Sequence, residues 1–240
     1  MFYHDLLMSF FQEIGEEKGI VFQKNLPAVE PVYGELKSPI HWRLEEILKK
    51  GNLTRFYSHQ VDAINAIREG KHIVISTRTA SGKSLCYNLP VIESIMGNTS
   101  NKALYIFPSK ALAQNQAARL EKYNYAFYYG DFNYGIYDGD THEETRRKLR
   151  KNAGIIITTP DMVHIGILPN HEKWKHFFQN LKFVVLDELH TYRGIFGSNI
   201  AHLLRRFRRI CHHYGSNPQF ICSSATIANP VELAKKLTLL

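Results

Sequence analysis

Short apolar segments alternate with longer amphipathic segments along the chain from about residue 58 onward. The apolar segments are rich in β-branched residues, which is typical of buried strands. They predict strands at 73–75, 103–107, 134–137, 155–158, 183–186 and 220–223. Between them, apolar residues recur at helical spacing, which predicts helices at 58–70, 110–123, 142–151, 172–179 and 197–214. Strands separated by helices indicate an α/β fold, in which a mostly parallel β-sheet has helices on both faces.

Residues 1–52 depart from this pattern. Pro27, Pro31 and Pro39 interrupt a stretch with little strand periodicity. Two short helices are predicted on either side of these prolines, at 6–17 and 41–50. We therefore expect residues 1–52 to form an N-terminal accessory segment that packs on a main domain of residues 53–240.

The chain is basic, and its charge bears on the kind of partner that it binds. Its 240 residues include 30 Lys and Arg against 22 Asp and Glu, which gives a net charge of +8. This excess of positive charge favours an anionic partner, and nucleic acid is the first candidate. A basic surface that serves only solubility would give the same net charge. Two predicted helices carry basic clusters, for which solvated or ion-paired outer faces are expected. The clusters are Arg146, Arg147, Lys148, Arg150 and Lys151, and Arg205, Arg206, Arg208 and Arg209.

Three cysteines, Cys86, Cys211 and Cys222, form an odd set without C-x-x-C spacing. This pattern argues against a zinc site and a disulfide framework, and it suits a reducing compartment. Cys86 and Cys222 sit in apolar runs and are predicted to be core thiols. No apolar run approaches the ~20 residues of a membrane span, and the start of the chain lacks the basic region of a signal peptide. A cytoplasmic protein without zinc or a membrane partner is expected.

A candidate phosphate-binding loop follows the predicted strand at 73–75. The chain passes through a polar stretch into Gly82-Lys83-Ser84 and then into a helical pattern. In such a strand–loop–helix, backbone N–H groups and the helix N-terminus bind nucleotide phosphates. Lys83 is suited to contact the β- and γ-phosphates, and the Ser84 hydroxyl is suited to bind Mg²⁺. Thr77 stands where the general pattern has its first glycine, so the motif alone also fits a helix start that happens to contain a lysine.

Two carboxylates stand directly after the predicted strand at 183–186, at the edge where ligands bind in open α/β sheets. Asp187 is suited to hold Mg²⁺, directly or through water. Glu188 is suited to orient and deprotonate a water that attacks a phosphoryl group. A strand that ends in Asp-Glu is common by chance, but its combination with the upstream loop predicts a nucleoside triphosphatase. Its predicted catalytic residues are Lys83, Asp187 and Glu188.

Several segments, in order, resemble the motifs of the first RecA-like domain of superfamily 2 helicases, the DExH kind. They are 58–60 (Q motif), 79–84 (motif I), 108–114 (Ia), 158–161 (Ib), 187–190 (II) and 224–226 (III). Further segments at 137–141, 166–171, 192–198 and 224–230 are similar to the mitomycin-repair helicases of the MrfA/YprA type. The resemblance extends from about residue 40 to the end of the chain. It implies a RecA-like P-loop fold.

The resemblance implies a motor that uses ATP and Mg²⁺ to move on single-stranded or forked DNA, 3′ to 5′, in DNA repair. An RNA helicase and a nucleotide-gated nucleic-acid-binding module without motor activity remain alternatives. Family members also carry a second RecA-like domain with an arginine finger, and a C-terminal cysteine cluster that binds zinc. Neither pattern occurs in this sequence, so the second motor domain is an expected partner. On DNA, such a protein would be associated with the nucleoid.

The matched motif positions imply roles for individual residues. ATP is expected to contact Tyr57, Gln60, Thr79, Ala80, Ser81, Gly82, Lys83 and Ser84, and Mg²⁺ is expected at Ser84 and Asp187. Nucleic acid is expected to contact Ser109, Lys110, Gln114, Gly139, Thr141, Thr159, Pro160 and Asp161. His190, Ser224 and Thr226 are expected to couple nucleotide state to DNA binding. Arg78 and Asn115 depart from the family pattern, which often has a smaller uncharged residue and an Asp at these positions.

Overall fold

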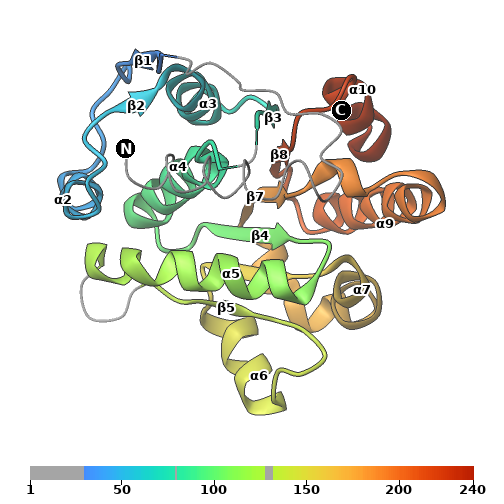
Figure 1. The fold of residues 1–240 in the computed structure, drawn as a ribbon. Coiled ribbons are helices and arrows are strands. Elements are labelled where there is room, and N and C mark those ends of the chain that lie inside the picture. The colour runs from blue at the N-terminus through green and yellow to red at the C-terminus, as the bar shows by residue number, and fades with distance from the viewer. Residues whose placement is uncertain (1–29, 79, 128–131) are drawn as a thin grey trace, which may run out of the picture. The chain divides into compact units, whose positions relative to one another are not determined.

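The structure is a computed structural model that describes residues 30–78, 80–127 and 132–240. Its centre is a six-stranded β-sheet in the order β3-β8-β7-β4-β6-β5 (Figure 1). The strands are β3 (Ile73–Ser76), β4 (Lys102–Ile106), β5 (Tyr134–Ile136), β6 (Ile155–Thr158), β7 (Leu181–Leu186) and β8 (Gln219–Ser224). Every neighbouring pair is parallel, which confirms the predicted sheet. The helix predicted at 6–17 lies outside the described residues.

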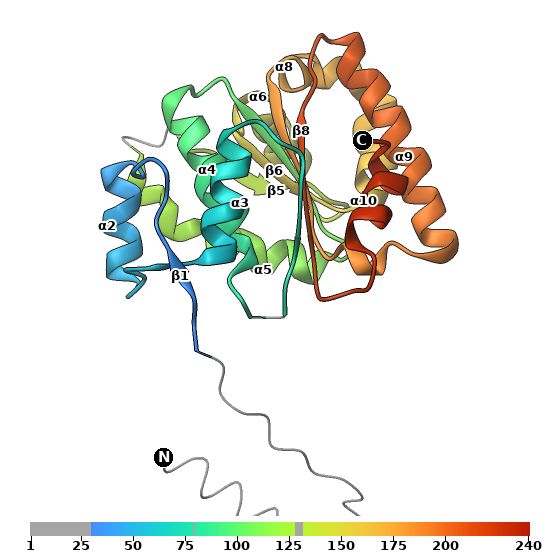
Figure 2. The same ribbon diagram turned by 90° about the horizontal axis from the view of Figure 1, so that it is seen from above.

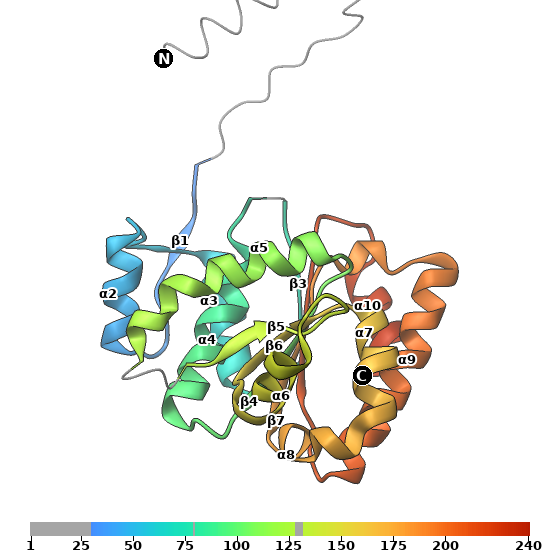
Figure 3. The ribbon, with the colours of Figure 1, turned by 90° about the horizontal axis from the view of Figure 1, so that it is seen from below.

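Helices lie on both faces of this sheet, as predicted. They are α2 (Trp42–Lys50), α3 (Ser58–Arg68), α4 (Lys83–Gly97), α5 (Lys110–Glu121), α6 (Glu143–Asn152), α7 (Pro160–Met162), α8 (Lys175–Gln179), α9 (Gly194–His213) and α10 (Pro230–Thr238). Figure 2 shows α3 and α4 on one face and α9 and α10 on the other. Figure 3, from the opposite side, shows the same division and places α7 beside α9.

The central strand β4 contributes to two cores, because side chains alternate along a strand. Leu104 and Ile106 pack with apolar residues of α8, α9 and α10, whereas Ala103 and Tyr105 pack with those of α3, α4 and α5. All four side chains are at most 1 % exposed. Burial of each large apolar side chain contributes roughly 1.5–3 kcal/mol. Burial on both faces also explains why the strands appear in the sequence as continuous apolar runs.

Some elements differ from the predictions. The helix predicted at 172–179 is divided into a 3₁₀ helix, η3 (Leu168–Trp174), and α8, because Trp174 at their boundary has φ −106° and ψ 7°. α9 begins at Gly194, earlier than predicted. Neither α10 nor the two-stranded antiparallel sheet of β1 (Tyr33–Gly34) and β2 (Phe56–Tyr57) was predicted. Strands of this length carry no periodicity that a sequence pattern can reveal.

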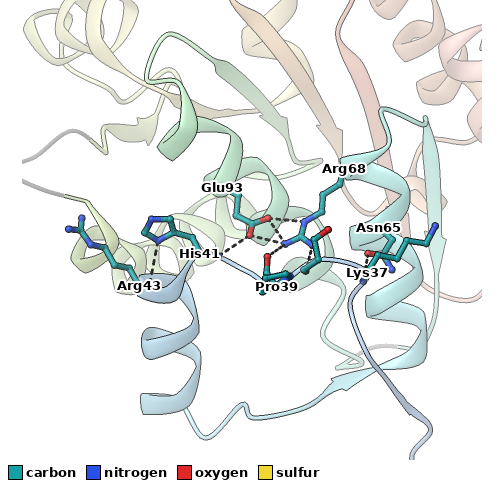
Figure 4. A network of polar contacts seen from close by, with 8 residues as sticks. Lys37, Pro39, His41, Arg43, Asn65, Arg68 and Glu93 are labelled. Carbon is teal, nitrogen blue, oxygen red and sulfur yellow. Dashed lines mark hydrogen bonds and ion pairs between the residues drawn. The ribbon is translucent and has the colours of Figure 1, made fainter.

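The segment before α3 is held against α3 and α4 by a polar network centred on Arg68 and Glu93 (Figure 4). Arg68 donates to the Glu93 carboxylate at 2.9–3.1 Å and to the Ser38 carbonyl at 2.7 Å. Glu93 also accepts a hydrogen bond from the backbone N–H of His41 at 3.3 Å. The side chains of Arg68 and Glu93 are only 21 % and 17 % exposed, so water screens their attraction incompletely. Residues Tyr33–Leu240 accordingly form one compact unit.

Arg68→Ala is expected to lower the free energy of unfolding by about 2–3 kcal/mol, because the mostly buried Glu93 carboxylate loses its cation. Urea denaturation measures this loss, with an unchanged dependence of the free energy on urea concentration. Lys37→Ala is the matched control, since it removes an exposed ion pair to Glu69 beside the same network. No measurable loss is expected for this control. Equal losses in the two variants would contradict the role given to Arg68.

Candidate functional site

The two predicted chemical motifs lie at the same edge of the sheet. The Gly82-Lys83-Ser84 loop follows β3, and Asp187 and Glu188 follow β7. β8 lies between these two strands and is parallel to both. The carboxyl ends of all three strands therefore meet at one edge, which is the usual ligand-binding edge of an open α/β sheet.

In the candidate phosphate-binding loop, the side chain of Lys83 contacts the backbone of the loop itself. Lys83 Nζ donates to the carbonyls of Thr77 and Arg78 at 3.0 and 2.9 Å. The hydroxyls of Thr77 and Ser81 share a hydrogen bond of 2.5 Å across the loop. Thr77, which replaces the first glycine of the general pattern, thus supports the loop through its side chain. Of the predicted ATP contacts in this loop, Ala80 is exposed and has φ +61°, and Thr79 lies outside the described residues.

Gln60 links the start of α3 to the loop. Its side chain is 2 % exposed, and Oε1 accepts from the backbone N–H of Tyr57 at 3.0 Å. Its Nε2 lies 3.5 Å from the Gly82 carbonyl oxygen. Gly82 has φ +80°, and a Cβ at this position would lie 2.4 Å from Gln60 Nε2, so only glycine fits without a shift of the glutamine. The amide predicted to contact ATP is therefore already engaged within the protein.

Asp187 is held by side chains from two other elements. Tyr87, from α4, donates its hydroxyl to Asp187 Oδ2 at 3.1 Å. Ser223, from β8, contacts Oδ1, which also accepts from the backbone N–H of Glu188 at 2.9 Å. Burial, and secondly the charge of Asp187, raise the pKa of Tyr87 well above its usual range, so its phenol remains a proton donor. The helix that starts at the phosphate loop is thereby connected directly to the carboxylate.

Of the predicted coupling residues, His190 lies beside Glu188, which has φ +52°. His190 Nδ1 is 3.3 Å from Glu188 Oε2, and it accepts from the backbone N–H of Ala225 at 3.4 Å. Ser224 contacts the loop through its backbone, since its carbonyl accepts from Thr77 N–H at 3.4 Å. Its hydroxyl is buried and has no hydrogen-bond partner among the described residues. Thr226 is exposed beyond this cluster.

Ser84 and Asp187 offer a hydroxyl and a carboxylate, the oxygen ligands that Mg²⁺ prefers. The Ser84 hydroxyl accepts a hydrogen bond from Arg119 Nη1, on α5, at 3.0 Å. These donor types fit Mg²⁺, which would have to displace Arg119 from the hydroxyl. Arg119 was not predicted. It lies three residues after Gln116, whose amide donates to Asn88 of α4 at 2.8 Å, so α5 and α4 meet only in the folded chain and no local sequence signal indicates this contact.

Two of the predicted nucleic-acid segments meet at the N-terminus of α5. Lys110 Nζ forms an ion pair with Asp140 at 2.7 Å, and a Cβ on Gly139 would lie 3.9 Å from the same nitrogen. Ser109 uses its hydroxyl to cap α5, where it accepts from Leu112 N–H at 3.4 Å. The loops around 109 and 139 are therefore neighbours, as a shared binding surface requires. Gln114 is exposed on the same helix.

Other predicted nucleic-acid contacts are engaged in local structure. The Thr141 hydroxyl lies 2.9 Å from Asp138 Oδ1 and 3.0 Å from the Ile136 carbonyl, so it stabilises its own turn. Thr159 is 9 % exposed and Pro160 is buried, whereas Asp161 is exposed at the start of α7. A ligand would meet the edge of this segment rather than these two buried side chains.

Cys86 and Cys222 are buried, which confirms the predicted core thiols, and burial raises the pKa of each to about 12. Within the described ranges, no three His, Cys, Asp or Glu side chains form a group suited to a metal ion. No helix in this part of the chain is long and apolar enough to cross a membrane.

Known sequences and structures resemble this chain over most of its length. Residues 57–234 match the DEAD/DEAH box helicase family. The ATP-dependent helicase YprA of Bacillus subtilis is 47 % identical over 233 residues, which are 96 % of this chain and 31 % of YprA. The ATP-dependent helicase hrq1 of Schizosaccharomyces pombe is 42 % identical over 88 % of this chain and 20 % of its own length. The crystal structure of the DUF1998 helicase MrfA bound to DNA matches with a TM-score of 0.89 at 45 % identity, covering 97 % of this chain and 33 % of that one.

The fold is therefore that of a RecA-like helicase domain. The chain belongs to the DEAD/DEAH box helicases, and its relatives place it with the MrfA/YprA type of superfamily 2. This confirms the predicted family, fold class and class of enzyme. The chain spans about a third or less of the length of these relatives.

Proposed function

We propose that this chain is the first motor domain of an ATP-dependent DNA helicase that moves 3′ to 5′ in DNA repair. Residues 53–240 form its ATP-binding domain, and residues 1–52 are accessory. The observation that carries the proposal is the hydrogen bond between Tyr87 and Asp187. It brings the helix of the candidate phosphate loop next to the carboxylate that follows β7, and a nucleoside triphosphatase needs these two groups close together.

In this proposal, binding of Mg-ATP changes the partners of three residues. Lys83 leaves the carbonyls of its own loop and contacts the β- and γ-phosphates. Arg119 would give way to Mg²⁺ at the Ser84 hydroxyl, and Asp187 would hold the ion as well, directly or through water. Mg²⁺ supplies charge neutralisation at the phosphates when it is bound. Glu188 orients the attacking water and accepts its proton.

Support for DNA as the second ligand comes from the relatives and from the surface beside the site. Two MrfA crystal structures are described as bound to DNA, one of them together with AMPPNP. In this chain, Lys110 and the turn at Gly139 offer a cation and an exposed backbone next to each other. Such groups bind phosphates without reading sequence. A second RecA-like domain would complete the site with an arginine finger.

The proposal is tested by measuring ATP hydrolysis and polymer binding by this chain. With a non-hydrolysable ATP analogue and Mg²⁺, single-stranded DNA is expected to bind about tenfold more tightly than RNA of the same sequence, a difference of ~1.4 kcal/mol. Hydrolysis by the chain alone is expected to be negligible with either polymer, because the arginine finger is proposed to come from a second RecA-like domain.

Each other outcome selects a different function. If RNA binds more tightly than DNA, the proposed ligand changes from DNA to RNA and the chain would be assigned to an RNA helicase. Brisk hydrolysis by the chain alone would contradict the need for a second motor domain. In a protein that joins this chain to a second RecA-like domain, nucleotide-dependent DNA binding without strand separation would favour a binding module over a motor.

A further inference from the structure

The helix α9 is strongly basic and lies outside the site described above. Its residues, Gly194–His213, include no Asp or Glu. They include four arginines and three histidines, which are Arg205, Arg206, Arg208, Arg209, His202, His212 and His213. Its apolar side chains pack into the core with β7 and β8, so the basic side chains occupy its outer face.

The sequence pattern predicts a solvated or ion-paired face here, and the structure excludes ion pairing within the described residues. Arg205 lies 3.3 Å from His202, and Arg206 Nη1 donates to His164 Nδ1 at 3.0 Å. Arg208 donates to the carbonyls of Thr238 and Leu239 at the end of α10. None of the α9 arginines has a carboxylate partner in this part of the chain. Their charge is therefore available to an anionic ligand.

A groove of about 360 Å³ lies between this face and the segment that begins with α7. The residues of α9 that line it include Phe196, Asn199, His202 and Arg206, and those of the facing segment include Asp161 and His164. Phe196 is 39 % exposed, so part of its ring is free for stacking. The groove thus combines a cation, an amide and an aromatic ring, a combination typical of surfaces that bind single-stranded nucleic acid.

We propose that this groove, the α7–α9 groove, binds single-stranded DNA beyond the predicted contact at Asp161. The inference rests on the proposed function, because Asp161 belongs to the segment expected to contact DNA. Arg206 contacts a phosphate, and Phe196 stacks on a base. His164 accepts one guanidinium hydrogen of Arg206 and thereby fixes its orientation, which leaves its other donors for phosphate oxygens.

Charge and continuity favour DNA over an acidic protein segment. Asp161 is the only carboxylate among the described residues that line the groove, and it lies in the segment already expected to meet DNA. Its oxygens can accept a hydrogen bond from the amino group of a base. An acidic peptide would also gain from the arginines of α9, but its carboxylates could neither donate a hydrogen bond to Asp161 nor stack on Phe196, as a base can.

The test compares Arg206→Gln with Arg209→Gln in this chain. Arg209 is the matched control, because it is exposed on the same helix and does not line the groove. Fluorescence anisotropy with labelled oligodeoxycytidylates of increasing length, whose bases carry an amino group, gives the dissociation constants at several salt concentrations. Arg206→Gln is expected to raise the dissociation constant for long oligomers about tenfold and to reduce the salt slope by about 0.7, the value for one lost phosphate contact on a single strand. Short oligomers, held at the Lys110 loop alone, are expected to bind as in the unmodified chain.

A second pair tests the stacking contact. Phe196→Ala is expected to lower the affinity for long oligomers about tenfold, which is the usual effect of losing one stacked base. Ile195→Ala is the control and is expected to leave the affinity unchanged. Ile195 precedes Phe196, is 84 % exposed and does not line the groove. Equal effects of Arg206→Gln and Arg209→Gln would contradict DNA binding in the α7–α9 groove, and so would unchanged binding in both groove variants. Neither result would contradict DNA binding elsewhere on the chain. If the unmodified chain binds no single-stranded DNA at all, both the groove and the proposed function fail.

Discussion

Lys83→Ala is expected to weaken Mg-ATP binding by about 100-fold, because a charge-assisted contact to phosphate contributes roughly 1.5–3 kcal/mol. The structure adds a second reason. Lys83 bridges the carbonyls of Thr77 and Arg78, so its removal also frees the loop that must present its N–H groups to the phosphates. Affinity is measured by titration of a fluorescent ATP analogue in the presence of Mg²⁺.

Arg78→Ala is the comparison variant for this experiment. It removes the same charge from the same loop, but Arg78 is exposed, and its contact with Lys83 uses the backbone carbonyl, which alanine keeps. A change of less than about threefold is expected, since an exposed charge contributes under ~1 kcal/mol. Retention of ATP binding by Lys83→Ala, or equal losses in the two variants, would remove the basis for a phosphate-binding loop.

Glu188→Gln is expected to reduce the rate of ATP hydrolysis about 10³-fold and to leave Mg-ATP affinity unchanged. Gln keeps the size of the side chain but cannot accept the proton of the attacking water, and such proton transfer contributes about 10²–10⁴ to a rate. His190 and Asp187 surround this position, and neither depends on the charge of Glu188 for its other contacts. The fold is therefore expected to survive the substitution.

The rate is measured in a protein that joins this chain to a second RecA-like domain, and the affinity in this chain alone. Glu144→Gln, an exposed carboxylate on α6 paired only with Lys148, is the control and is expected to leave both values unchanged. A parallel loss of affinity and rate in Glu188→Gln would assign Glu188 to metal or nucleotide binding. An unchanged rate would exclude it as the base.

Much of the site could be predicted because its residues are adjacent to elements with strong local signals. Gly82, Lys83 and Ser84 follow a β-branched strand and start a helix, and Asp187 and Glu188 end an apolar run. Strand–loop–helix geometry is local, so these positions follow from the order of residues. The sheet was equally predictable, because strands buried on both faces leave continuous apolar runs in the sequence.

Three contacts were not predictable, since each joins residues that only the fold brings together. Tyr87 and Ser223 hold Asp187 from α4 and β8, and Arg119 reaches Ser84 from α5. None of these side chains belongs to a local pattern that distinguishes it from an ordinary core or surface residue. The same is true of Arg68 and Glu93, which are 25 positions apart and hold the segment before α3.

By itself the sequence determined the class of fold, the phosphate loop, the carboxylate pair and the family, because these depend on spacing along the chain. The tertiary structure decided which side chains hold the carboxylate, that the first residues of the compact unit pack on α3 and α4, and that the arginines of α9 have no carboxylate partner among the described residues. The partners of the charged side chains on a helix come from the segments that pack beside it in the fold. These segments are distant in the sequence, so no local pattern reveals whether a basic face is ion-paired or free to bind an anion.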